Sequence, residues 1–227
     1  MSWTQKEHKK LYPGLGANQG LGKWIVRETH PQKLLEFGCG TGVLLNYIHN
    51  FSLSKKDRHI ECAVGIEPEK MNEYFLNPNG PTQICADITE QDISNHPIFI
   101  KNPHFDLILS VEVMEHIDRK YHQIVFDFLA SKASKWIVFS GARMGQVGHG
   151  HIACRAEEDW RSEWISRGFT FLPTHTNSIR AHSDNNRPNH RKNMQVFIKN
   201  EYVNLLTPLI LGPPIQNKSK KLQAKNK

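Results

Sequence analysis

The chain has 227 residues, of which 38% are hydrophobic, and a net charge of +7 at pH 7; this is enough for one α/β domain with a full core and small extensions. Its four cysteines are widely spaced and form no C-x-x-C pair, which argues against a disulfide-stapled secreted fold. There is no apolar N-terminal h-region and no apolar run near the roughly 18 residues that span a bilayer, so we expect a cytoplasmic protein without a membrane span.

The first residues are polar, and we expect residues 1–18 to form an N-terminal arm ahead of a main domain at 19–212. Residues 19–30 have the apolar spacing of a short amphipathic helix, which ends before Pro31 because proline disfavours helix in the residue preceding it. Packing explains Trp24 in this helix better than contact with a ligand.

The stretch 34–42, Leu-Leu-Glu-Phe-Gly-Cys-Gly-Thr-Gly, combines a short apolar run with three alternating glycines, and a helical pattern follows it. It predicts a buried strand at 33–37, a tight turn and a helix start. Without a Cβ, the glycines permit unusual backbone angles and let a ligand lie against the main chain. The spacing G-x-G-x-G differs from both the dinucleotide fingerprint and the phosphate-loop motif, so a pyrophosphate site is disfavoured.

Acidic residues follow the next two predicted strands, at 60–66 and 82–86. Ligands of open parallel sheets bind outside the carboxyl ends of the strands, which places Glu67 where a carboxylate accepts hydrogen bonds from ribose hydroxyls. Its alternative role is that of an acid at the N-terminus of a helix predicted from 69 to 76. Asp87 is likewise either a ligand acceptor or the cap of a turn.

A fourth buried strand is predicted at 105–111, and Glu112-Val-Met-Glu-His-Ile-Asp follows it. Glu112 and His116 are four residues apart, so on a helical turn they share a face. Such a pair is either a surface pair or part of a site beside the strand end.

The glycine turn, Glu67, Asp87 and the 105–117 stretch together resemble the class I S-adenosylmethionine-dependent methyltransferases, whose first motif is E/D-x-G-x-G-x-G. The likeness covers roughly 19–172. It implies an α/β fold with a Rossmann-like seven-stranded, mostly parallel sheet, helices on both faces and an antiparallel last strand. It also implies S-adenosyl-L-methionine as cofactor. The cofactor-binding residues expected from it are Gln19, Glu36, Gly38, Cys39, Gly40, Gly42, Glu67, Pro68, Asp87, Ile88, Ser110 and Val111.

The chain then continues with a core-facing helix expected at 117–130, a fifth strand at 136–140 and a helix at 157–167. Trp160 and Trp164 lie four apart in that helix. We interpret them as packing residues rather than a stacking platform.

The segment from Ser140 to Ile152 holds four glycines together with His149 and His151, and we expect a substrate loop at the carboxyl end of the sheet. It bears a weaker likeness to a G-Q-x-G-x-G-H segment of some carbohydrate-linked methyltransferases. The two histidines act as general base or substrate contact, serve as structural loop residues, or ligate a metal through the H-x-H spacing. No nearby Cys or acid completes a metal set, although distant residues could, and we assign no metal ligand. The catalytic candidates are His149, His151, Glu112 and His116.

Strands at 169–172 and 194–199 complete the expected sheet, and 173–193 is a polar, basic insertion between them. The resemblance implies that this insertion shapes substrate specificity. The alternative is a mobile loop, because the insertion shows no strong hydrophobic period. The tail at 213–227 is expected to be disordered.

Positive charge is concentrated at the end of the chain. Residues 173–227 contain ten Lys/Arg and two Asp/Glu, a net +8, which leaves −1 for the rest. The interpretations are a solvated tail or contact with an anionic partner such as nucleic acid.

Three functions follow. We favour O-methylation of a small-molecule or saccharide hydroxyl. The alternatives are methylation of RNA, DNA or another macromolecule docked through the basic region, with Arg180, Arg187 and Arg191 on phosphates, and a non-catalytic nucleoside-binding protein of the same fold.

Overall fold

The computed structural model describes residues 16–70, 75 and 77–206. The expected tail, most of the expected arm and most of the helix expected at 69–76 lie outside these residues. In chain order the elements are α2 (Gln19–Glu28), β1 (Lys33–Phe37), α3 (Val43–Leu53), β2 (Cys62–Glu67), β3 (Thr82–Cys85), α4 (Pro97–Lys101), β4 (Phe105–Val111), η1 (Met114–His116), η2 (Arg119–Tyr121), α5 (His122–Lys132), β5 (Ala133–Ser140), α6 (Glu157–Ile165), β6 (Phe169–Phe171), α7 (Pro173–His182), α8 (Pro188–Asn193), β7 (Gln195–Lys199) and η3 (Asn200–Tyr202).

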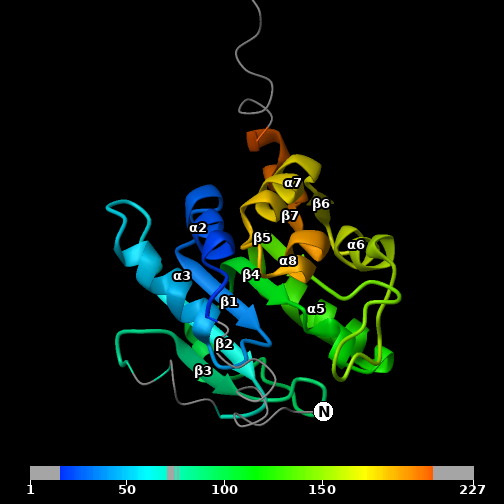
Figure 1. Cartoon of the computed structure of the whole chain (residues 1–227). Coiled ribbons are helices and arrows are strands. Elements are labelled where there is room, and N and C mark those ends of the chain that lie inside the picture. The colour runs from blue at the N-terminus through cyan, green and yellow to red at the C-terminus, as the bar shows by residue number, and fades with distance from the viewer. Residues whose placement is uncertain (1–15, 71–74, 76, 207–227) are drawn as a thin grey trace, which may run out of the picture.

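The strands form one seven-stranded sheet in the order β3-β2-β1-β4-β5-β7-β6 (Figure 1). β7 runs antiparallel to β5 and β6, and the other neighbouring strands pair in parallel. β1 and β4 lie at the centre and are buried along nearly their whole length, as their continuous apolar runs require. The expected Rossmann-like sheet with an antiparallel last strand is confirmed.

Helices cover both faces of the sheet because successive strand residues point to opposite sides (Figure 1). Leu34 of β1 packs in the core formed with α2 and α3, whereas Leu35 packs in the core formed with α5 and α6. Trp160 and Trp164 are 1% and 0% exposed in this second core, which agrees with their expected packing role. None of the helices in the described residues is long and apolar enough to cross a bilayer.

Two local expectations need correction. The helix expected from 117 begins at His122, because Asp118 caps the separate 3-10 turn η2 by accepting a hydrogen bond from the Lys120 N–H at 3.1 Å. The insertion at 173–193 is not an irregular loop, since it contains α7 and α8. Only Thr176 and Ile179 of α7 are buried, so the helix needs few apolar residues. The sequence therefore shows almost no apolar period from which this helix could be predicted.

The segment between α7 and α8 is tied to the start of α2. Asp184 accepts hydrogen bonds from the backbone N–H groups of Gln19 and Gly20 at 2.8 and 2.9 Å. The Asn18 side chain caps α2 through the Leu21 N–H and also accepts from the Asp184 N–H. These bonds satisfy the otherwise unpaired donors of the helix end. They fix the insertion against the domain.

Candidate active site

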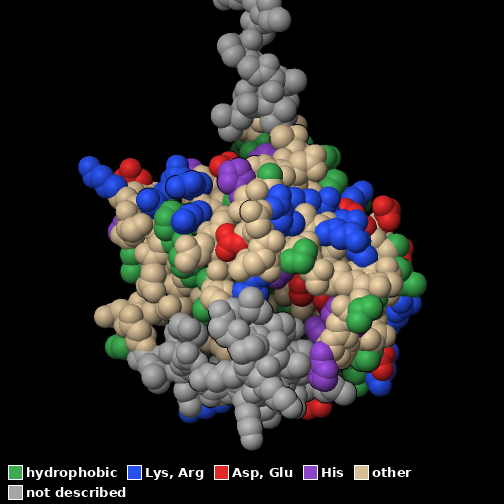
Figure 2. Space-filling view, viewed as in Figure 1, with side chains coloured by type: hydrophobic (Ala, Val, Ile, Leu, Met, Phe, Trp, Pro, Cys, Tyr) green, Lys and Arg blue, Asp and Glu red, His purple; other side chains and the backbone are tan. Residues whose placement is uncertain are grey.

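A cavity of about 1140 Å³ opens at the carboxyl ends of β1, β2 and β4. The order of the strands reverses between β1 and β4, the place where parallel α/β sheets bind ligands. The cavity is lined by the glycine turn, by the ends of β2 and β3, by the segment after β4, by the loop after β5 and by the residues leading into α8. In Figure 2 acidic and histidine side chains are visible in a hollow of the face shown.

The glycine turn after β1 needs its glycines. Gly38, Gly40 and Gly42 have φ of 70°, 51° and 81°, in the left-handed region that side chains disfavour. A Cβ on Gly38 would lie 2.4 Å from Val113, and one on Gly42 would lie 2.4 Å from Phe75. The turn therefore lets its backbone approach both the cavity and its neighbours closely.

Two carboxyl groups lie beside this turn. Glu67, at the end of β2, accepts a hydrogen bond from the Gly40 N–H at 2.9 Å, and burial raises its pKa to about 7. Glu36 is 4% exposed, one of its oxygens has no hydrogen-bond partner among the described residues, and burial together with Glu67 raises its pKa to about 8. A pair of carboxyl groups held in this way suits a cationic ligand that also offers hydroxyl donors.

Asp87 follows β3 and lines the same part of the cavity. Its Oδ1 accepts from the backbone N–H and the hydroxyl of Thr89 at 2.9 and 2.6 Å, as in a turn cap. The lining also includes Glu36, Gly38, Cys39, Gly40, Glu67, Pro68, Ile88 and Val111 of the expected cofactor residues. Gln19, Gly42 and Ser110 are not part of it: Gln19 and Gly42 lie at the starts of α2 and α3, and Ser110 is buried in β4.

Glu112 and His116 do not share a helical turn, contrary to the expectation from their spacing. Glu112 has a φ of 54°, and only residues 114–116 form a 3-10 turn. The Glu112 carboxylate instead accepts hydrogen bonds from the side-chain amides of Gln146 and Asn193 at 2.8 and 3.0 Å. Glu112 thereby joins the end of β4 to the glycine-rich loop and to α8, and both Glu112 and His116 line the cavity.

The glycine-rich loop returns to the end of β4 through backbone hydrogen bonds. Its base is closed by a bridge between Arg143 and Arg155. The Glu115 carbonyl accepts from the N–H groups of Ile152 and Ala153 at 2.9 and 3.0 Å. These contacts bring His151 beside the 3-10 turn, although the two segments are distant in the chain.

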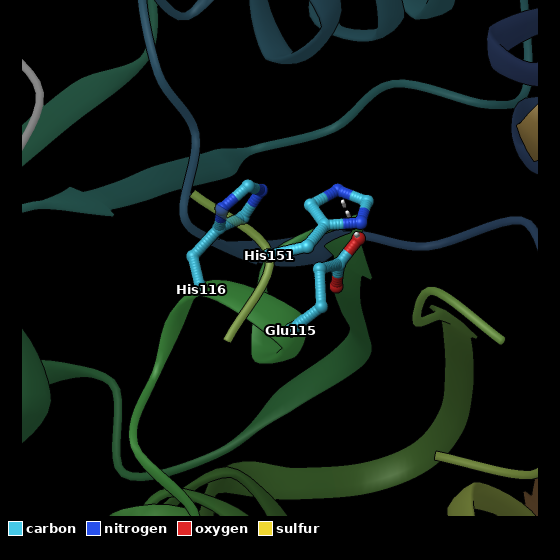
Figure 3. Close-up of side chains that lie close together, drawn as sticks. All are labelled: Glu115, His116 and His151. Carbon is cyan, nitrogen blue, oxygen red and sulfur yellow. Dashed lines mark ion pairs between the residues drawn. The ribbon is translucent and has the colours of Figure 1, made fainter. Parts of the chain in front are cut away.

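Glu115, His116 and His151 form a compact cluster at this end of the cavity (Figure 3). One potential ligand atom of each lies within 4.8 Å of the others, and Glu115 Oε1 is 3.9 Å from His151 Nε2. Glu115 is 0% exposed; burial and then Glu112 raise its pKa to about 8, while burial lowers the pKa of His116 to about 4. His149 lines the cavity from an exposed position in the same loop.

Sequence reasoning missed three members of this region: Glu115, Asn193 and His190. Glu115 directly precedes His116, and a second acid beside that histidine was the available signal. Asn193 and His190 belong to α8, and no motif marks them; burial lowers the pKa of His190 to about 4, and its Nδ1 lies 3.1 Å from the Asn18 amide nitrogen.

A family model described as a methyltransferase domain matches residues 20–173. The chain belongs to this methyltransferase family. Membership confirms the expected class I S-adenosylmethionine-dependent methyltransferase and, with it, the expected cofactor. The glycine turn, the carboxyl pair and the partnerless buried oxygen of Glu36 fit that cationic nucleoside. A search among curated proteins finds no match.

Solved structures share the fold at low sequence identity. Magnesium protoporphyrin IX methyltransferase from Synechocystis PCC 6803 with bound SAH is 14% identical, with a TM-score of 0.53 over 79% of this chain and 80% of that one. The plantazolicin methyltransferase BpumL in complex with SAH is 14% identical, with a TM-score of 0.51 over 86% and 87%. The DhpI-SAH complex is 9% identical, with a TM-score of 0.51 over 79% and 82%.

The described part of the basic region is largely engaged within the protein. Arg180 pairs with Glu157 at 2.7 Å and donates to the Met194 carbonyl at 2.8 Å. Arg187 donates to the Gly16 carbonyl and Arg191 to the Asn185 side chain. Figure 2 shows Lys and Arg side chains on the upper part of the face drawn. Nothing in these contacts favours phosphate binding over a structural role.

Proposed function

We propose that this methyltransferase transfers the methyl group of S-adenosylmethionine to a hydroxyl of a small molecule or saccharide. The observation that carries the proposal is one continuous cavity of about 1140 Å³. It joins a cofactor end, beside the glycine turn and Glu67, to a histidine end, beside His116, His149 and His151. Ligand pockets generally measure about 300–1,000 Å³, so there is room for both the cofactor and a small acceptor.

At the cofactor end we assign the ribose hydroxyls to Glu67, the adenine end to Asp87 and the backbone approach to the glycine turn. Glu36 and Glu67 are both buried, and a positively charged ligand favours their ionised forms. Bound S-adenosylmethionine supplies a methyl group whose bond to sulfur breaks, with the electron pair remaining on sulfur, as the acceptor oxygen forms its new bond to carbon.

The reaction leaves one proton to be removed from the acceptor hydroxyl. We assign this general-base role to His149, which is exposed and lines the cavity next to His151. Imidazole is suited to proton removal near neutral pH. A positioned base contributes about 10² to 10⁴ in rate, and alignment of donor and acceptor provides the larger share of catalysis.

The test is transfer of a radiolabelled methyl group into fractionated cell extract. We expect label in small, uncharged or saccharide compounds and expect it to withstand mild alkali, since ethers survive conditions that hydrolyse methyl esters. His149→Gln should lower the rate about 10²-fold or more and leave cofactor affinity unchanged. Label in RNA, DNA or protein, or alkali-labile label, overturns the acceptor assignment. An unchanged rate for His149→Gln overturns the base.

A further inference from the structure

We propose that Glu115, His116 and His151 bind a divalent transition-metal cation that holds the acceptor oxygen. The cation site itself stands on the geometry of the cluster. Its role toward the acceptor rests on the proposed function above.

The donor set is that of a metal site. Two imidazoles and one carboxylate form the protein ligands of several catalytic zinc sites, which keep a further position for water or substrate. The same set binds other first-row cations. Ligands about 2.1 Å from a tetrahedral metal lie about 3.4 Å from one another. The 3.9 Å between Glu115 Oε1 and His151 Nε2 therefore needs little closure.

A bound cation would stabilise the buried Glu115 carboxylate. It is 0% exposed, and among the described residues neither of its carboxylate oxygens accepts a hydrogen bond of good geometry, although the backbone N–H groups of Glu115 and Ala142 lie near the carboxyl group. Burying a carboxyl group without hydrogen bonds is costly, and buried charges in proteins are normally paired or coordinate metals.

Both histidines are oriented as metal ligands are. Nδ1 of His116 lies 3.1 Å from the Gly150 carbonyl oxygen, and Nδ1 of His151 lies 3.1 Å from the Gln146 carbonyl oxygen. A carbonyl only accepts, so each Nδ1 carries the proton and each Nε2 carries the lone pair. Metal-ligating histidines show this pattern, in which an outer hydrogen bond fixes the tautomer.

Glu112 supports this arrangement as a positioning residue. Its carboxylate holds the Gln146 side chain at 2.8 Å, and the Gln146 carbonyl in turn orients His151. Asn193 bonds both Glu112 and Gln146 from α8. The left-handed backbone of Glu112 is thus maintained by a network that ends on the cluster.

The cation would act as a Lewis acid. His116 and His151 line the cavity, so a coordination position on that side is accessible to an acceptor hydroxyl. A bound cation would lower the pKa of a coordinated hydroxyl, and His149, which lines the cavity, would receive the proton. Coordination and proton transfer change no oxidation state, so this step needs no oxidant or reductant.

The test is binding of Co²⁺, Mn²⁺ and Zn²⁺ to the full chain after chelation and dialysis, without cofactor or acceptor. We expect one cation per chain, with Co²⁺ giving the visible absorption of a low-coordinate nitrogen and oxygen site. Loss of an outer hydrogen-bond partner already weakens metal sites about 10–100-fold. Replacing a direct ligand should weaken cation binding by more than this, and we expect that of Glu115→Gln, His116→Gln and His151→Gln.

The matched control is His182→Gln, which removes an exposed histidine on α7 outside the cavity. It should bind the cation as the wild type does. Circular dichroism and thermal unfolding establish whether each variant is folded. If a histidine variant does not fold, Glu115→Gln still tests the site, because Gln has nearly the volume of Glu. Absence of stoichiometric binding by the wild type, or equal binding by the folded cluster variants, overturns the site.

The two proposals fail separately. If the cluster binds metal but the methyl label enters only an acceptor other than a hydroxyl, the proposed function is overturned and the metal site is not. Full hydroxyl methylation in the presence of a chelator overturns the catalytic role of the cation and leaves the proposed function standing.

Discussion

Replacing Glu36 with Gln should stabilise the cofactor-free protein in a pH-dependent way. Glu36 is 4% exposed in β1 beside Glu67, and its pKa is raised from 4.5 to about 8. Below about pH 4.5 the carboxyl is protonated in both the folded and the unfolded chain, so stability is fully present. As the pH rises toward 8, the unfolded chain loses the proton first and stability falls.

The size of the effect follows from the same values. One pKa unit corresponds to about 1.4 kcal/mol, so the rise from 4.5 to about 8 costs on the order of 4 kcal/mol of unfolding free energy at pH 8. Gln cannot ionise and keeps the shape of the side chain. Glu36→Gln should therefore exceed the wild type by that amount at pH 8 and by less than about 1 kcal/mol at pH 5.

Urea unfolding at the two pH values measures the difference, and Glu90→Gln, on an exposed surface position, is the control. An equal difference between Glu36→Gln and the wild type at pH 5 and pH 8 would refute the reasoning. The same variant should bind cofactor more weakly, because the carboxyl that destabilises the empty site is the one that favours a cationic ligand.

Two further predictions concern the cofactor end. Glu67→Gln should raise the Kd for S-adenosylhomocysteine about 10- to 150-fold, since a hydrogen bond to a charged acceptor contributes about 1.5–3 kcal/mol; calorimetry measures it, and wild-type affinity would remove the ribose assignment. Gly38→Ala should lower the unfolding free energy by about 1–3 kcal/mol, because the residue has a φ of 70° and its Cβ would meet Val113 at 2.4 Å. Thermal unfolding tests this, and an unchanged Tm would show that the turn has another geometry.

The cofactor end could be predicted because each of its features is local. Alternating glycines after an apolar run specify a turn. Glu67 and Asp87 directly follow the apolar runs of the next two strands, which marks them as strand-end acids. Parallel pairing of β1 with β2 then brings these positions to one edge of the sheet without further information.

The histidine end could not be predicted to the same depth. The spacing of Glu112 and His116 puts them on one face only if the segment is a helical turn. The left-handed backbone of Glu112 breaks that turn, and its side chain bonds Gln146 and Asn193 instead. Glu115 was overlooked because an acid beside a histidine ordinarily lies at the surface. Its burial depends on a loop that returns from residue 152.

The sequence by itself determined the strand-turn-helix unit, the order of the strands through β5 and the family, because apolar periodicity, glycine spacing and strand-end acids are properties of adjacent residues. Only the tertiary structure decided that α8 lines the cavity and that Glu115, His116 and His151 meet. Their meeting depends on contacts between segments distant in the chain, and no local propensity encodes such distances.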